Sequence, residues 1–162
     1  MKVEIVRSPR RRKTITAEHR GGKVVVRLPA GLTQAEERTW VRKMVNRLTE
    51  SERLERLNAK MNLERRALEL NERYFDGRLR WRSIRWVGNQ RYRYGSCTPS
   101  DKTIRIASRV AEYPSWVRDY VLMHELAHLR IADHSSRFWE VVRRYPLAER
   151  ARGYLIAKGL EE

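Results

Sequence analysis

Residues 124 to 134 read HELAHLRIADH, and this short segment constrains the fold more than any other part of the sequence. It holds three of the four histidines of the chain, with a glutamate directly after the first. His124 and His128 are four residues apart, so on a helix their side chains lie on one face, about one turn apart. That spacing suits two ligands of one metal ion, and the fold must then bring further ligands to this helix face.

A third ligand and a catalytic base are present in the same segment. Catalytic zinc sites have three protein ligands and one position for water, and His134 is the candidate third ligand, because the chain after His128 is long enough to end the helix and turn back. Glu125 is rotated about 100° around the helix from His124, close enough to reach a metal-bound water without being a ligand. In such a site the ion lowers the pKa of the water and the glutamate accepts its proton.

The alternative is that the three histidines are ordinary surface or core residues. The pattern around them disfavours it, because apolar residues on several sides of the segment predict a largely buried helix. Buried imidazoles need polar partners, and one metal ion supplies a partner to each of them. We therefore expect a metal site.

The N-terminal third of the chain predicts strands followed by helices. Alternating apolar residues indicate two or three antiparallel strands over residues 3–28, with residues 19–22 as a turn. Thr33 and Glu36 have the spacing of a capping box and predict a helix over residues 33–48.

A second helical region follows. Thr49 or Ser51 is the expected cap of this region, which extends to Tyr74 with a break near Asn62. The Asp-Gly pair at 76–77 is expected to end it.

Residues 78–97 combine six arginines with tryptophan and tyrosine in alternation, which predicts strands with a bulge or a break. A hairpin through residues 98–102 then leads to a strand over 103–108. One interpretation is a groove for a nucleic-acid strand, since arginine holds phosphates and aromatic rings stack on bases. The other is a sheet whose aromatic side chains face the core while its arginines face water.

After Pro114 the pattern is helical, with helices expected over residues 115–131, 135–145 and 147–159. The fold class is therefore α+β. We expect a compact domain with an N-terminal antiparallel β-hairpin region, a small mixed or antiparallel sheet, and the HExxH helix followed by two helices. At 162 residues the chain has the size of one domain, so we expect residues 1–162 to form a single domain.

The charge balance points to a polyanion as a candidate partner. There are 36 Lys and Arg residues against 20 Asp and Glu residues, a net charge of +16. Such a surface attracts nucleic acid, acidic lipid or a phosphate-bearing substrate, although it can equally serve solubility alone. The N-terminus lacks the apolar run of a signal peptide, no stretch resembles a membrane span, and Cys97 has no cysteine partner within the chain. We therefore expect a cytoplasmic protein.

Four motifs carry a resemblance to a known family. They are RYGSC at 93–97, TIRIAS at 103–108, YVLMHELAHL at 120–129 and DHSSRFW at 133–139. In this order the chain resembles the YgjP-like metal-dependent hydrolases, relatives of the SprT and Spartan group of zinc metallopeptidases. It departs from their pattern at Tyr94, where tryptophan is usual, and at Asp133, where asparagine is common. It does not resemble the metzincins, because Ile131 stands where their motif has glycine.

The resemblance implies a zincin-type metallohydrolase domain that binds Zn²⁺. It makes His124, His128 and His134 the zinc ligands and Glu125 the catalytic glutamate, in agreement with the reasoning from spacing.

Four residues between 93 and 97 are further candidates for the site. Arg93, Tyr94 and Ser96 are candidate contacts for the substrate or for an oxyanion. Cys97 is either a fourth ligand, which would close the shell as in a structural zinc site, or a small core residue.

The leading functional prediction is a zinc-dependent hydrolase, a metallopeptidase that cleaves a peptide or protein substrate and acts near nucleic acid. In one alternative the protein still uses the metal but cleaves a different bond, the phosphoanhydride of a nucleotide bound in a cationic pocket. Another is a non-catalytic nucleic-acid-binding module that zinc stabilises. Glu125 favours catalysis, because a structural zinc site needs no base.

Overall fold

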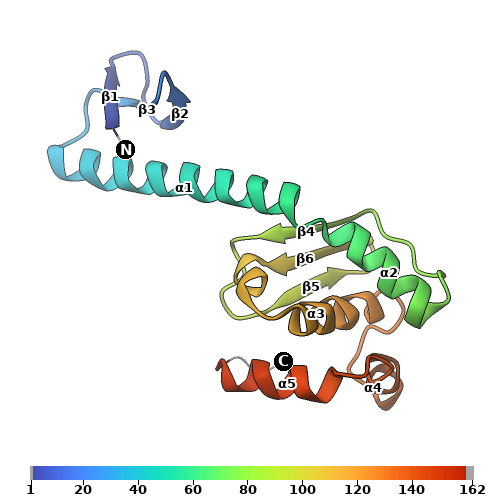
Figure 1. Cartoon of the computed structure of the whole chain (residues 1–162). Helices are drawn as coiled ribbons and strands as arrows, with labels where there is room; N and C mark the ends of the chain where they lie inside the picture. Colours follow the sequence, from blue (N-terminus) through green and yellow to red (C-terminus); the bar gives the residue numbers. More distant parts are fainter. Residues whose placement is uncertain (1, 160–162) are drawn as a thin grey trace. The chain divides into compact units, whose positions relative to one another are not determined.

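The computed structural model describes residues 2–159 and divides into two compact units, an N-terminal unit of residues 1–55 and a C-terminal unit of residues 56–162. The division falls within helix α1, Gln34–Lys60. The N-terminal unit has a small mixed sheet of three strands beside α1, and the C-terminal unit has another with several helices beside it (Figure 1). The predicted α+β class is confirmed, and the single domain over residues 1–162 stays a prediction.

The sheet of the N-terminal unit has the order β1-β3-β2, formed by β1 (Lys2–Ser8), β2 (Thr16–Arg20) and β3 (Lys23–Pro29). The predicted antiparallel hairpin is β2–β3, and its turn is Gly21–Gly22, both at positive φ. The expectation of antiparallel pairing was wrong for β1, which runs parallel to β3. Alternation predicts which face of a strand is buried, but the direction of its neighbour depends on how the connecting loop crosses.

The core of this unit lies between β3 and α1. Val24, Val26 and Leu28 are buried against apolar side chains of α1, among them Val41 and Met44. The capping box is confirmed. The amide of Thr33 donates to the carboxylate of Glu36 at 2.8 Å, and the amide of Glu36 donates to the hydroxyl of Thr33 at 3.3 Å.

The predicted second cap at Thr49 or Ser51 was wrong, because α1 continues through both residues to Lys60. Hydroxyl side chains occur inside helices as well as at their ends, and no glycine or proline interrupts this segment. The break near Asn62 is confirmed. Asn62 caps α2 (Leu63–Phe75) by accepting from the amide of Arg65 at 3.0 Å. Asp76 and Gly77, both in the left-handed region, end α2 as predicted.

The sheet of the C-terminal unit has the order β4-β6-β5, with β4 (Ser83–Val87) parallel and β5 (Gly95–Thr98) antiparallel to β6 (Thr103–Ala107). Ile84 and Trp86 are buried and Arg85 between them is exposed, so alternation here reflects a sheet with one buried face. The expected strand ends at Val87, and residues 88–94 form a loop. A 3₁₀ helix, Ser108–Glu112, follows β6.

Three helices complete the unit: α3 (Ser115–Ala127), α4 (Ser136–Val142) and α5 (Ala148–Ala157). Helix α3 packs against β5 and β6 and contacts α2, α4 and α5, so it is largely buried as predicted. It ends at Ala127 rather than at residue 131, because the chain must turn before the next helix begins. Within residues 2–159, no helix is long and apolar enough to cross a membrane.

Candidate metal centre

The three predicted histidine ligands meet at one point of the C-terminal unit. His124 lies in α3, His128 is the residue that caps its C-terminus, and His134 lies two residues before α4. Their Nε2 atoms are 3.2, 3.1 and 3.0 Å apart. Three nitrogens bound tetrahedrally to one zinc ion at about 2.0–2.1 Å lie about 3.3 Å apart. The three residues could therefore hold a metal ion with little rearrangement.

The tautomer of His128 suits a ligand. Its Nδ1 lies 2.9 Å from the carbonyl oxygen of Ile131, which can only accept a hydrogen bond. Nδ1 therefore carries the proton, and the Nε2 of the neutral ring presents a lone pair to the cluster. Burial, above all, lowers the pKa of His128, which favours the neutral ring that a metal needs.

His124 is the most buried of the three ligands, with 8% of its surface exposed. Burial lowers the pKa of His124 to about 3, and the neighbouring His128 and His134 act in the same direction. The imidazole is therefore neutral at physiological pH. A cluster of neutral imidazole nitrogens is a donor set that zinc accepts readily.

Aromatic rings from α4 support the three imidazoles. The ring of Phe138 is fully buried and lies 4.8, 4.4 and 4.8 Å, centroid to centroid, from His124, His128 and His134. Trp139 stacks on His134 at 5.6 Å. The aromatic pair in FWE was visible in the sequence, but its role beneath all three ligands was not. These contacts restrict the ring orientations before any ion arrives.

All the predicted site residues line one cavity of about 430 Å³. The three histidines and Glu125 form one part of its wall, and the segment from Arg93 to Cys97 forms another. Glu125 is buried, with 6% of its surface exposed, although it borders this cavity. The structure thus brings Glu125 and the three histidines to the same cavity.

Gly95 is a residue of the site that the sequence reasoning did not single out. A Cβ atom built on Gly95 would lie 2.5 Å from Oε1 of Glu125 and 2.7 Å from its Cγ. Strand β5 therefore approaches the glutamate so closely that only glycine fits. Because Cγ is affected as well as the carboxylate, any side chain at this position must displace Glu125.

With the catalytic role predicted for Glu125, Gly95→Ala should lower hydrolytic activity by about 100-fold, the effect expected when a catalytic group moves by about 1 Å. Zinc content should be retained, because the clash affects the glutamate and not the histidines. Activity and bound zinc should be measured on the same preparation. Gly153→Ala is the matched control, since a Cβ there meets no atom within 4 Å, and equal losses in both variants would refute the prediction.

The three candidate contacts for substrate or oxyanion differ in their surroundings. The hydroxyl of Tyr94 donates to the carbonyl of Leu155 at 2.9 Å, so this group is engaged with α5. Oγ of Ser96 accepts from Nε2 of Gln90 at 2.6 Å. Arg93 is exposed at the cavity. Of the three side chains, that of Arg93 has the greatest freedom to meet a ligand.

Cys97 lines the same cavity but has the properties of a protonated thiol. Burial, followed by the negative charge of Glu125, raises the pKa of Cys97 to about 12. A metal ligand must be a thiolate. Among the described residues, the cluster whose atoms could hold an ion consists of the three histidines.

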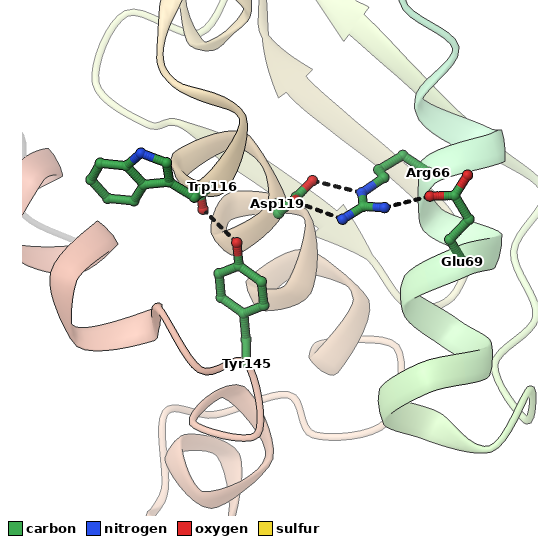
Figure 2. Close-up of polar contacts among 5 residues, drawn as sticks. All are labelled: Arg66, Glu69, Trp116, Asp119 and Tyr145. Atoms are coloured by element: carbon green, nitrogen blue, oxygen red, sulfur yellow. Dashed lines mark hydrogen bonds and ion pairs between the residues drawn. The ribbon is translucent and has the colours of Figure 1, made fainter.

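Two hydrogen bonds from Arg66 to Asp119 hold α3 against α2. Arg66 of α2 donates twice to this carboxylate, at 2.8 Å each, and also bonds to Glu69, as Figure 2 shows. The carboxylate of Asp119 is therefore engaged with Arg66. Nearby, the hydroxyl of Tyr145 donates to the carbonyl of Trp116 at 3.1 Å. These bonds hold α3, which carries His124, in register with α2 and with the segment before α5.

Comparison with known proteins identifies the fold and the family of the chain. The chain resembles the solved structure of the metallopeptidase zymogen of Pyrococcus abyssi abylysin with a TM-score of 0.53 and 22% identity, over 60% of this chain and 94% of that one. This likeness concerns the fold. No curated protein matches the chain. The family model of the YgjP-like metallopeptidase domain matches residues 48–156, which include every residue of the cavity. The chain therefore belongs to the YgjP-like family of metallopeptidase domains.

Proposed function

We propose that this protein is a zinc metallopeptidase in which His124, His128 and His134 hold the ion and Glu125 is the general base. The observation that carries the proposal is the convergence of three imidazole nitrogens beside a buried glutamate on one cavity wall. Membership in a metallopeptidase family supports the reaction class. Zinc is the preferred ion because catalytic zinc sites commonly use three histidines and one open position.

Zinc, when bound, would lower the pKa of a water molecule and polarise the scissile carbonyl. The protein would contribute the rest. Glu125 would accept the proton of the attacking water and pass it to the nitrogen of the departing amine. Its burial strengthens this role, because proton transfer in a site shielded from solvent meets less competition from bulk water.

The substrate would lie along β5. This strand is at the end of its sheet, and Gly95, Ser96 and Cys97 of β5 line the cavity. An edge strand offers backbone donors and acceptors to an extended peptide. The peptide would pair with β5 as an additional strand and would run past the metal centre. Backbone pairing suits a peptide better than a nucleotide, and this favours peptide hydrolysis over cleavage of a phosphoanhydride.

The positive charge of the protein favours a polyanion as a binding partner. A net charge of +16 attracts nucleic acid from a distance, so we propose that the peptidase acts on proteins close to nucleic acid. A location in the cytoplasm is part of the same proposal.

One experiment tests the function. The purified protein should contain one zinc ion per chain and hydrolyse members of a peptide library, whereas a panel of nucleoside triphosphates should remain intact. Removal of zinc with a chelator should abolish hydrolysis and its return should restore it. Hydrolysis of nucleotides alone would favour the phosphoanhydride alternative. A zinc-bound protein that cleaves neither class, and unfolds when the metal is removed, would favour the structural module.

A further inference from the structure

The loop of residues 90–93, which precedes β5 at the rim of the cavity, is held from within by one arginine. Nη1 of Arg109 donates to the carbonyls of Gln90 at 2.8 Å and Arg91 at 3.0 Å, and Nη2 donates to that of Arg93 at 2.7 Å. The guanidinium also lies 5.2 Å from the centroid of the Tyr94 ring. These bonds replace the ladder that a strand would have provided, so an irregular loop has a defined backbone.

Because Arg109 bonds to the backbone of the loop, the side chains of residues 91–93 stay exposed. Arg91 and Arg93 are exposed, and Tyr92 between them has 81% of its surface exposed. Tyrosine and arginine are the residue types that most often anchor a binding partner. A loop already held in one conformation loses little entropy when a partner binds. Exposed arginine and tyrosine side chains on a loop with a fixed backbone are therefore well suited to bind a partner.

Arg93 differs from its neighbours because it also lines the metal cavity. Apart from the histidines and Glu125, the other side chains that line it are uncharged. In the part of the chain that the structure describes, no carboxylate forms an ion pair with Arg93. A guanidinium pairs strongly and in a fixed geometry with a carboxylate.

We infer that Arg93 is a specificity-determining residue that binds a carboxylate of the peptide substrate next to the scissile bond. Arg109 is its positioning residue and acts through the backbone of the 90–93 loop. The inference rests on the proposed peptidase function and adds a substrate class to it. The carboxylate can come from an aspartate or glutamate side chain or from the C-terminus of a short peptide, and both sources present the same group.

Matched peptides test the inference and distinguish the two sources. Once a cleaved peptide is known, glutamate and glutamine are compared at each position flanking the cleaved bond, and a free C-terminus is compared with its amide. We expect the carboxylate form to have a higher kcat/KM by about 5- to 10-fold at one of these positions, the size expected for a partly exposed charge-assisted pair. Arg93→Gln should reduce this ratio to about one.

Arg85→Gln is the matched control, because Arg85 is an exposed arginine of β4 that does not line the cavity. It loses the same charge and should keep the wild-type ratio. A ratio near one in the wild-type protein, or an equal drop in both variants, would overturn the inference while the peptidase function stands. The second outcome would assign the preference to overall charge.

Binding supplies a readout that does not depend on turnover. Fluorescently labelled peptides are titrated into the zinc-loaded Glu125→Gln protein, with Arg93 intact or replaced. Tighter binding of the carboxylate peptide that disappears with Arg93→Gln supports the inference even if hydrolysis is never detected, in which case the peptidase function alone fails. If nucleoside triphosphates bind more tightly than these peptides through Arg93, the carboxylate assignment is overturned.

Arg109→Met tests the positioning role. This substitution removes the hydrogen bonds that hold the 90–93 loop. It should raise KM for the carboxylate peptide several-fold and leave kcat unchanged, since the metal centre lies on other elements. A fall in kcat at unchanged KM would instead mark Arg109 as a purely structural residue. Partial recovery of KM by Arg109→Lys, which restores one donor group, would support positioning through the backbone carbonyls.

Discussion

Glu125→Gln should lower kcat for peptide hydrolysis by about 10²- to 10⁴-fold and leave the zinc content unchanged. The amide has nearly the same volume as the carboxylate, so it fits the narrow space beside Gly95, but it cannot accept a proton from water. The affinity for peptide should change little, because the histidines and the cavity wall stay in place. The measurements are steady-state hydrolysis of a peptide identified in the library and metal analysis of the same sample.

Glu140→Gln is the control for this substitution. Glu140 is an exposed glutamate of α4 that does not line the metal cavity, and its replacement changes the net charge by the same amount. It should retain full activity. If Glu125→Gln hydrolyses peptides at the rate of the Glu140 variant, then Glu125 is not the base and the zincin mechanism is wrong for this protein.

Acid should destabilise the metal-free protein strongly, with His124 as the main cause. The pKa of His124 is lowered to about 3 in the folded chain, whereas a histidine in an unfolded chain has a pKa of about 6.5. Between these values the unfolded chain binds the additional proton, so stability rises with pH and falls as the pH is lowered from about 6.5 toward 3. One proton corresponds to a slope of about 1.4 kcal/mol per pH unit.

His128 adds to this loss, because its pKa is lowered as well. The measurement is the free energy of unfolding of the metal-free protein from urea titrations at several pH values. His124→Gln should reduce the slope below pH 6.5. A slope that is the same in the wild-type protein and in this variant would show that the histidine cluster does not set the acid sensitivity. Bound zinc should protect the protein until protons displace it.

Much of the candidate site could be predicted because its signals are local. The spacing of His124, Glu125 and His128 corresponds to one helical turn, and an α-helix converts that spacing into a shared face. The capping box at Thr33 is equally local and forms as expected, and the predicted break near Asn62 coincides with the start of α2. Such features depend on a few neighbouring residues and change little with tertiary context.

The features that could not be predicted depend on residues far apart in the sequence. Arg109 holds a loop that lies 16 to 19 positions earlier, and nothing in the sequence indicates that three carbonyls turn toward it. The parallel direction of β1 depends on the path of its loop. Thr49 and Ser51 were interpreted as caps because they are typical cap residues, but no glycine or proline interrupts the segment and α1 continues through both.

The contact of Gly95 with Glu125 has a consequence for how this enzyme can evolve. Every amino acid other than glycine carries a Cβ atom, and any mutation at position 95 therefore displaces Glu125, the proposed base, whatever the chemical character of the new side chain. The position has no conservative replacement and cannot drift neutrally while catalysis is selected. Under the proposed mechanism, a protein that keeps the fold and the three histidines but has another residue at this position should have lost most of its hydrolytic activity.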